Sequence, residues 1–296
     1  MIYLPHFGLR EPPFGITPDT SFFYVCSSSQ EALNTLLVAV ANGEGFIKIT
    51  GEVGTGKTLL CRKLLATLDD GWVSAYIPNP DLEPKTLLLA LAEEMNVKLD
   101  SALDQHHLLK ALNLALLDFA RDKKRVIVCL DETQAMPLES LETLRLLTNL
   151  ETEKRKLVQV ILFGQPELDE RLSHKSIRQL RQRITFQHQL GTLTHEETGH
   201  YLAHRLEIAG YSGDRVFAPA AVRTIYRASR GVPRLVNILA NKAMMVAYGE
   251  GTRVVGARHA RAATADTPAA FALSRGWLWL ALGSIAFSSI GWMILR

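Results

Sequence analysis

The sequence predicts an α/β fold in which helices cover both faces of a parallel five-stranded sheet and a helical lid follows. Strand-like and helical segments alternate through residues 46–190, and this alternation is typical of a parallel sheet. The strand-like segments are nearly continuous apolar runs, as expected where helices bury both faces. From Thr194 onward only helical periodicity remains. A Gly-rich loop directly after the first strand adds the strand–loop–helix setting of a P-loop.

The same patterns place the individual elements. We expect strands at Phe46–Gly51, Trp72–Ile77, Arg125–Asp131, Leu157–Gly164 and Ile184–Leu190. Helices are expected at Gln30–Ala41, Leu59–Leu68, Thr86–Met95, His107–Ala120, Leu138–Leu150 and Glu167–Leu172. Lid helices are expected at Thr194–Ala209, Pro219–Arg230 and Pro233–Tyr248, with a last one within 249–275. Thr194 and Glu197 fit a capping box at the start of the first lid helix.

The loop after the first strand fits the pattern G-x-x-x-x-G-K-[ST]. Its glycines let backbone N–H groups point at phosphate oxygens, and the following helix adds the positive end of its dipole. Lys57 is expected to contact the β- and γ-phosphates of ATP, and the Thr58 hydroxyl to bind Mg²⁺. The expected nucleotide contacts are Gly51, Glu52, Val53, Gly54, Thr55, Gly56, Lys57, Thr58 and Leu59.

An acidic pair supplies what hydrolysis needs in addition. Asp131 and Glu132 follow the apolar run 126–130. We expect Asp131 to hold Mg²⁺ through water, and Glu132 to orient and deprotonate the attacking water. Gln165 follows the next strand, where a polar side chain can contact the γ-phosphate or position that water. The alternative for Gln165 is a turn residue before Pro166.

Arginines form a further set of candidates. Arg178, Arg181 and Arg183 precede the last strand, where an arginine can reach the γ-phosphate of a neighbouring subunit. Arg183 is the preferred arginine finger and Arg181 the next. Arg234 begins a lid helix after Gly231-Val232-Pro233 and is expected to lie over the phosphates as a second sensor. For each arginine that precedes the last strand, the alternative is a solvated or salt-bridged surface arginine.

Composition narrows the function classes. The 33 basic and 30 acidic residues give a net charge of +3, which does not favour nucleic acid as a partner. Cys26, Cys61 and Cys129 are widely spaced and fit neither a disulfide framework nor a zinc site. The hydrophobic fraction of 47% is that of a globular protein with a sizeable core.

The two ends of the chain differ in character. Residues 1–45 carry several aromatics among prolines, which either frame an adenine base or pack onto the core; no signal peptide is recognisable there. Residues 277–295 carry no charge and would form a helix about 28 Å long, with tryptophans near both ends. We expect one transmembrane helix there, the alternative being a buried or docked tail.

The motifs together resemble the ExeA/GspA-like branch of the AAA+ ATPases over about residues 1–265. The resemblance is carried by the P-loop and by further motifs: Phe7-Gly8-Leu9 with Pro13-Phe14, Leu130-Asp131-Glu132-Thr133-Gln134, Phe163-Gly164-Gln165-Pro166-Glu167-Leu168, Leu180-Arg181-Gln182-Arg183-Ile184 and Gly231-Val232-Pro233-Arg234. It implies an AAA+ P-loop NTPase core with sheet order 5-1-4-3-2 and a C-terminal lid.

The resemblance also implies a function. It predicts an ATPase that uses ATP and Mg²⁺, forms a homo-oligomeric ring such as a hexamer, and helps to assemble a type IV (MSHA-type) pilus or type II secretion machinery. Its expected partners are the membrane and assembly proteins of the inner membrane, with no nucleic acid. The expected location is the bacterial inner membrane, single-pass, with the ATPase domain in the cytoplasm. Two alternatives remain: a DNA-transaction ATPase similar to transposition helpers, and a nucleotide-switch scaffold without turnover.

These expectations divide the chain into five regions. An N-terminal segment that packs near the nucleotide is expected at 1–45, and the ATPase core at 46–190. The lid is expected at 191–262, a linker at 263–276 and the transmembrane helix at 277–295.

Overall fold

The chain passes twice between two units in the computed structural model, which describes residues 1–149, 151–152 and 155–270. The core unit comprises Thr17–Thr192. The lid unit combines Met1–Ile16 with the described residues from Leu193 onward. Both ends of the described chain therefore belong to the lid unit.

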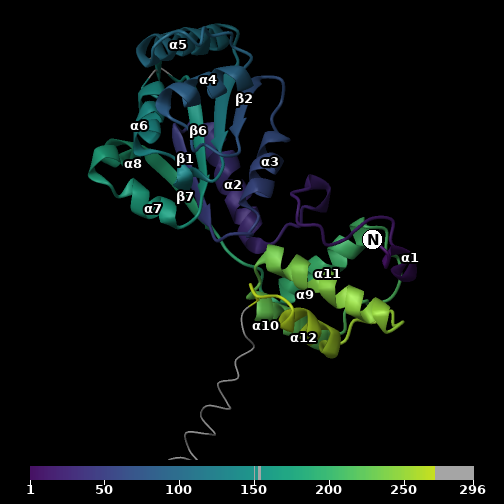
Figure 1. Cartoon of the computed structure of the whole chain (residues 1–296). Helices are drawn as coiled ribbons and strands as arrows, with labels where there is room; N and C mark the ends of the chain where they lie inside the picture. Colours follow the sequence, from purple (N-terminus) through teal and green to yellow (C-terminus); the bar gives the residue numbers. More distant parts are fainter. Residues whose placement is uncertain (150, 153–154, 271–296) are drawn as a thin grey trace, which may run out of the picture. The chain divides into compact units, whose positions relative to one another are not determined.

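The core unit is built on a parallel sheet with the strand order β2-β3-β6-β1-β7 (Figure 1). The strands are β1 (Phe46–Gly51), β2 (Trp72–Ile77), β3 (Arg125–Leu130), β6 (Val158–Gly164) and β7 (Ile184–Leu190). The predicted sheet and its order are thus confirmed. A short antiparallel hairpin that the sequence did not predict, β4 (Glu151–Thr152) with β5 (Arg155–Lys156), precedes β6.

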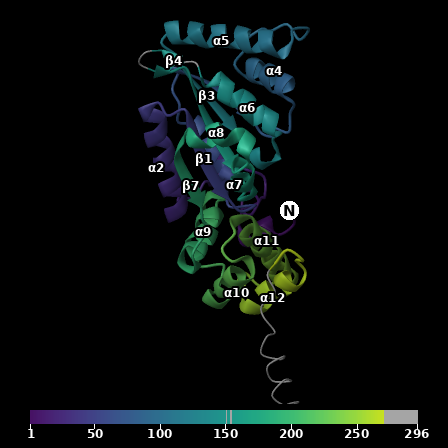
Figure 2. The ribbon, with the colours of Figure 1, turned by 90° about the vertical axis from the view of Figure 1, so that its left-hand side faces the viewer.

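Helices cover both faces of this sheet, because successive strand residues point to opposite sides. In β3, Ile127 and Cys129 pack with α2 (Ser27–Asn42) and α3 (Lys57–Leu65). Val126 and Val128 face the other way and join the apolar cluster of α4 (Pro84–Glu94), α5 (Gln105–Arg121) and α6 (Leu138–Leu147). Figure 2 shows α2 on one side of the sheet and α6 and α8 (Arg178–Gln182) on the other.

The lid unit consists of helices whose patterns the sequence predicted. They are α9 (His195–Ile208), α10 (Pro219–Ser229), α11 (Pro233–Gly249) and α12 (Ala257–Ala265). The capping box of α9 is confirmed. The Glu197 N–H donates to Thr194 Oγ1 at 3.1 Å, and the Thr194 N–H donates to Glu197 Oε2 at 2.8 Å.

The N-terminal segment expected at 1–45 divides between the two units, and its first sixteen residues pack on the lid helices. The Tyr3 hydroxyl, on a fully buried side chain, donates to Asn241 Oδ1 at 2.5 Å. The Arg10 N–H donates to the Ala209 carbonyl at 2.9 Å. Burial raises the pKa of Tyr3 to about 12. Tyr3, Phe7 and Phe14 are therefore core residues of the lid unit.

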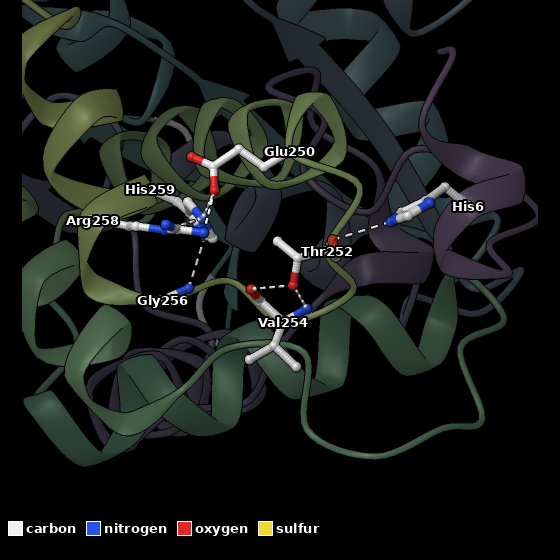
Figure 3. A network of polar contacts seen from close by, with 7 residues as sticks. All are labelled: His6, Glu250, Thr252, Val254, Gly256, Arg258 and His259. Atoms are coloured by element: carbon white, nitrogen blue, oxygen red, sulfur yellow. Dashed lines mark hydrogen bonds and ion pairs between the residues drawn. The ribbon is translucent and has the colours of Figure 1, made fainter.

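Polar contacts hold the loop between α11 and α12 (Figure 3). The His6 Nε2 lies 3.1 Å from the Thr252 carbonyl oxygen, which links the N-terminal helix α1 (Leu4–Phe7) to this loop. The Gly256 N–H donates to Nδ1 of the buried His259 at 2.9 Å, and His259 Nε2 lies 3.1 Å from a Glu250 carboxylate oxygen. The Arg258 guanidinium pairs with the same carboxylate. The start of α12 is thus fixed to the end of α11.

The predicted localisation is corrected by the helices of the structure. Across residues 1–149, 151–152 and 155–270, no helix is both long and apolar enough to cross a bilayer. No helix of these residues supplies the single transmembrane span that the prediction requires. The segment 277–295, on which that prediction rested, lies outside the described residues.

Gly231 gives a test of lid packing. Its φ is +75°, and a Cβ built there would lie 1.9 Å from the Leu193 carbonyl oxygen. We expect Gly231→Ala to lower the free energy of unfolding by more than about 2 kcal/mol, because both the backbone conformation and the contact become unfavourable. Urea unfolding of the chain measures this. The control is Gly249→Ala, where a Cβ would meet nothing within 4 Å; equal midpoints for the two variants would contradict the packing described.

Candidate functional site

The P-loop connects the end of β1 to the start of α3. Gly54 and Gly56 have φ values of +82° and +103°, which turn successive N–H groups in a way that L side chains rarely allow. Lys57 is the first residue of α3, and its side chain is buried. Its ammonium donates to the carbonyls of Gly51 at 2.7 Å and Glu52 at 3.0 Å. The loop thus gathers a cation and backbone donors at a helix N-terminus, the arrangement that binds phosphate.

The end of β3 meets the P-loop helix directly. The Thr58 hydroxyl donates to Asp131 Oδ2, and the Glu132 N–H donates to Asp131 Oδ1 at 3.0 Å. Burial raises the pKa of Asp131, and these two hydrogen bonds oppose the shift only in part. Hydroxyl and carboxylate oxygens are the ligands that Mg²⁺ prefers, and a nearby cation stabilises the ionised form of a buried carboxylate. The side chains of Thr58 and Asp131 therefore fit the predicted Mg²⁺ site.

Glu132 is held by two glutamine side chains. Gln165 Nε2 donates to Glu132 Oε2 at 2.9 Å, and Gln134 Nε2 donates to the same oxygen at 2.6 Å. The Gln165 N–H in turn donates to Gln134 Oε1 at 3.0 Å. Burial alone would raise the pKa of Glu132, but the two glutamine hydrogen bonds and the charge of Lys57 together outweigh it and lower that pKa. Glu132 is therefore ionised and oriented.

Lys57 and the acidic groups around it form one electrostatic set. Burial lowers the pKa of Lys57, while Glu132, Asp131, Glu52 and Glu167 oppose the shift. Burial disfavours the charged form of the Lys57 ammonium, whereas the carboxylates around it favour that form. Such opposing effects on one pKa are common at functional sites.

Arg183 lies at the other end of the sheet. It precedes Ile184, which pairs with Phe46 at the start of β1, whereas the P-loop follows the end of that strand. The six residues of β1 separate the carboxyl ends of the strands, which the P-loop follows, from their amino ends, where Arg183 lies. This is a distance of about 17 Å. The Arg183 Nη1 donates to the Arg145 carbonyl at 3.3 Å and to Thr148 Oγ1 at 3.2 Å.

A cavity of about 230 Å³ adjoins this arginine. It is lined by Gly45, Phe46, Thr148, Asn149, Lys156 and Arg183. Two cationic side chains, those of Lys156 and Arg183, thus line one cavity near the amino ends of the strands, away from the P-loop. Arg181, the second candidate, is exposed on α8.

Arg234 belongs to the lid unit, exposed in the first turn of α11. Its role therefore stays a prediction. The structure brings together Lys57, Thr58, Asp131, Glu132 and Gln165 at one edge of the sheet and places Arg183 and Arg181 away from them.

Sequence reasoning gave no role to Gln134 or Lys156. Gln134 lies in the short 3₁₀ turn after β3, two residues beyond Glu132. The available signals were a polar residue in the turn next to a candidate catalytic carboxylate and its place at the end of a motif of the resemblance. Lys156 lies in the unpredicted hairpin, so no element pattern pointed to it.

Residues 40–172 match the protein family described as AAA domain. The core has the AAA P-loop fold. General secretion pathway protein A of Aeromonas hydrophila is 40% identical over 254 residues, which are 86% of this chain and 46% of that protein. The chain thus spans less than half the length of this curated relative.

Solved structures agree with this fold. Cdc6p of Pyrobaculum aerophilum matches with a TM-score of 0.69 at 20% identity, over 88% of this chain and 73% of that one. The ORC2 protein of Aeropyrum pernix matches with a TM-score of 0.62 at 18% identity, over 84% and 72%. RuvB of Thermotoga maritima matches with a TM-score of 0.54 at 16% identity, over 84% and 72%. At these identities the likeness extends to the fold alone.

The raised pKa of Asp131 predicts a stability change. In the folded chain the ionised carboxylate is disfavoured, so stability falls as pH rises from the ordinary aspartate pKa through the raised one. We expect nucleotide-free Asp131→Asn to unfold at a higher temperature than the wild type at pH 7.5. The difference should shrink at pH values below the ordinary pKa. Thermal unfolding measures both.

The matched control is Asp118→Asn, whose side chain is 65% exposed on α5. It should leave the midpoint unchanged. A lower midpoint for Asp131→Asn than for the wild type at pH 7.5 would contradict the account of this carboxylate.

Proposed function

We propose that this protein hydrolyses ATP with Mg²⁺ and that it uses the reaction in assembling a secretion or pilus machinery. The observation that carries the ATPase proposal is the convergence of Lys57, Thr58, Asp131, Glu132 and Gln165 at the carboxyl edge of the sheet. General secretion pathway protein A supports the process, since it is 40% identical and its name states a role in secretion.

The residues divide the work as follows. P-loop N–H groups and Lys57 bind the phosphates, and Thr58 and Asp131 hold Mg²⁺. When bound, Mg²⁺ neutralises part of the charge on the phosphate oxygens. Glu132 accepts a proton from water as the water oxygen bonds to the γ-phosphorus. The bond to the β–γ bridging oxygen breaks, and its electron pair leaves with ADP.

Arg183 acts in the site of a neighbouring copy. Its place about 17 Å from its own P-loop supports this role, because it does not reach its own phosphates. Contacts with the Arg145 carbonyl and Thr148 orient its guanidinium beside the cavity at that edge. Arg234 acts as a lid sensor, and Gln165 contacts the γ-phosphate while it orients Glu132. The active form is therefore a homo-oligomer, such as a ring.

The finer choice between machineries rests on different observations. The identity to general secretion pathway protein A favours secretion. The motifs also resemble those of the MSHA pilus biogenesis ATPase MshM, which makes pilus assembly the second candidate.

Mixing two inactive variants tests the shared site. Glu132→Gln should bind ATP but lose about 10²-fold or more in turnover, because it lacks the proton acceptor. Arg183→Ala should lose turnover while keeping its own P-loop residues intact. In a random mixture about a quarter of sites combine an intact Glu132 with a neighbour's intact Arg183, so activity should return.

Two outcomes contradict this proposal. Full turnover by Glu132→Gln alone would remove the role of Glu132. A mixture that stays as inactive as its components, although both variants bind ATP, would show that Arg183 does not act on a neighbour.

Copurification tests the process. Because Glu132→Gln should bind ATP without turnover, it should keep the oligomer assembled with its partners. Purification of this variant from crosslinked cells should therefore recover secretion or pilus components in an ATP-dependent manner. Lys57→Met, which lacks the phosphate contact, serves as the control. Recovery of DNA-transaction proteins alone would overturn the proposed process in favour of the alternative class.

A further inference from the structure

Gln134 bridges the two loops that carry Glu132 and Gln165. Its side-chain N–H donates to Glu132 Oε2 at 2.6 Å, while its Oε1 accepts the Gln165 N–H at 3.0 Å. It thus bonds to the catalytic carboxylate with one end of its amide and to the backbone of the next loop with the other. A hydrogen bond to a charged acceptor is about twice as strong as one between neutral groups.

Glu132 needs such support because its backbone is strained. Its φ and ψ are +52° and +36°, a left-handed conformation that residues other than glycine seldom adopt. Strain of this kind persists only where the surroundings enforce it. Asp131, the preceding residue, adds a like charge, whereas Lys57 on α3 attracts the carboxylate. The orientation of Glu132 is therefore set by its hydrogen-bond donors as well as by its backbone.

The two amide donors meet on a single oxygen. Gln134 and Gln165 both bind Oε2 of Glu132, at 2.6 and 2.9 Å. Two bonds to one oxygen limit rotation of the carboxylate and leave Oε1 outside this clamp. The oxygen that takes the proton thereby has a defined direction, which a single flexible donor would not give.

A purely structural role is already filled by another residue. The hydroxyl of Thr133, which is fully buried, donates to the Phe163 carbonyl at 2.6 Å. This bond ties the turn after β3 to the end of β6. The hydrogen bond that Gln134 Oε1 accepts from the Gln165 N–H is therefore not the sole tie between these two loops.

We propose that Gln134 is a positioning residue for ATP hydrolysis, which holds Oε2 of Glu132 so that Oε1 receives the proton of the attacking water. The inference rests on the proposed ATPase function. Gln134 works through Glu132 and makes no contact of its own with ATP. Its loss should therefore lower kcat and leave ATP binding unchanged.

Two substitutions separate the donor from the acceptor of this amide. Gln134→Glu keeps an oxygen for the Gln165 N–H and replaces the donor to Glu132 with a second carboxylate. Gln134→Met removes both interactions at similar length. At pH 8 we expect both to lower kcat about tenfold or more, with KM for ATP within about twofold of the wild type.

The controls concern folding and length. Gln30→Met changes a glutamine on the exposed face of α2, where its partner is Asn34, and should leave kcat unchanged. Gln134→Asn keeps the amide but shortens its reach, and it should also lower kcat. If thermal unfolding shows that Gln134→Glu is unfolded, the kcat of Gln134→Asn tests the inference in its place.

The outcomes distinguish this inference from the proposed function. Wild-type turnover in Gln134→Glu together with loss in Gln134→Met would overturn the inference, because the bond to Gln165 alone would then matter. A raised KM with unchanged kcat would overturn it as well. No turnover by the wild type at any protein concentration would overturn the proposed function itself, and the inference with it.

Discussion

Parallel pairing of β3, β6 and β1 is the constraint on which the site depends. Leu130 pairs with Leu162, and Thr50 pairs with Gly164, so all three strands end at the same edge. The residues that follow these ends are therefore neighbours in space although the sequence separates them widely. The Thr58–Asp131 and Gln165–Glu132 hydrogen bonds are consequences of this register. A shift by one residue would turn every strand side chain to the opposite face and separate the pairs.

The carboxyl ends of these strands bring together charged side chains, each of which would be unfavourable to bury alone. Burial raises the pKa of Asp131 and lowers that of Lys57. Without the other group, burial would therefore favour the neutral form of each. Each also moderates the cost of the other, and hydrogen bonds from two glutamines keep Glu132 ionised beside them. Such a set is costly in stability but suited to a ligand that carries both phosphates and a divalent cation.

The sequence predicted the features that depend on neighbouring residues. Apolar runs bounded by glycine gave β1 and β6, and the P-loop spacing gave Lys57 and Thr58. Contacts between distant residues were beyond it: Tyr3 bonds to Asn241, 238 positions away, so the place of the first sixteen residues in the lid unit did not follow from local pattern. Gln134 was named within a motif but given no role, because a glutamine in a turn has no periodicity that points to its contacts. The hairpin strands β4 and β5 have two residues each, too few for an alternating pattern.

Arg183 precedes the amino end of β7, whereas its own P-loop follows the carboxyl end of the neighbouring β1. A site that uses this arginine requires a second copy of the chain. The most direct test is the ATPase activity per molecule, measured over about a hundredfold range of protein concentration. We expect this activity to rise steeply with concentration and then to reach a plateau as copies associate. The same activity per molecule at every concentration, down to conditions where the protein is monomeric, would contradict it.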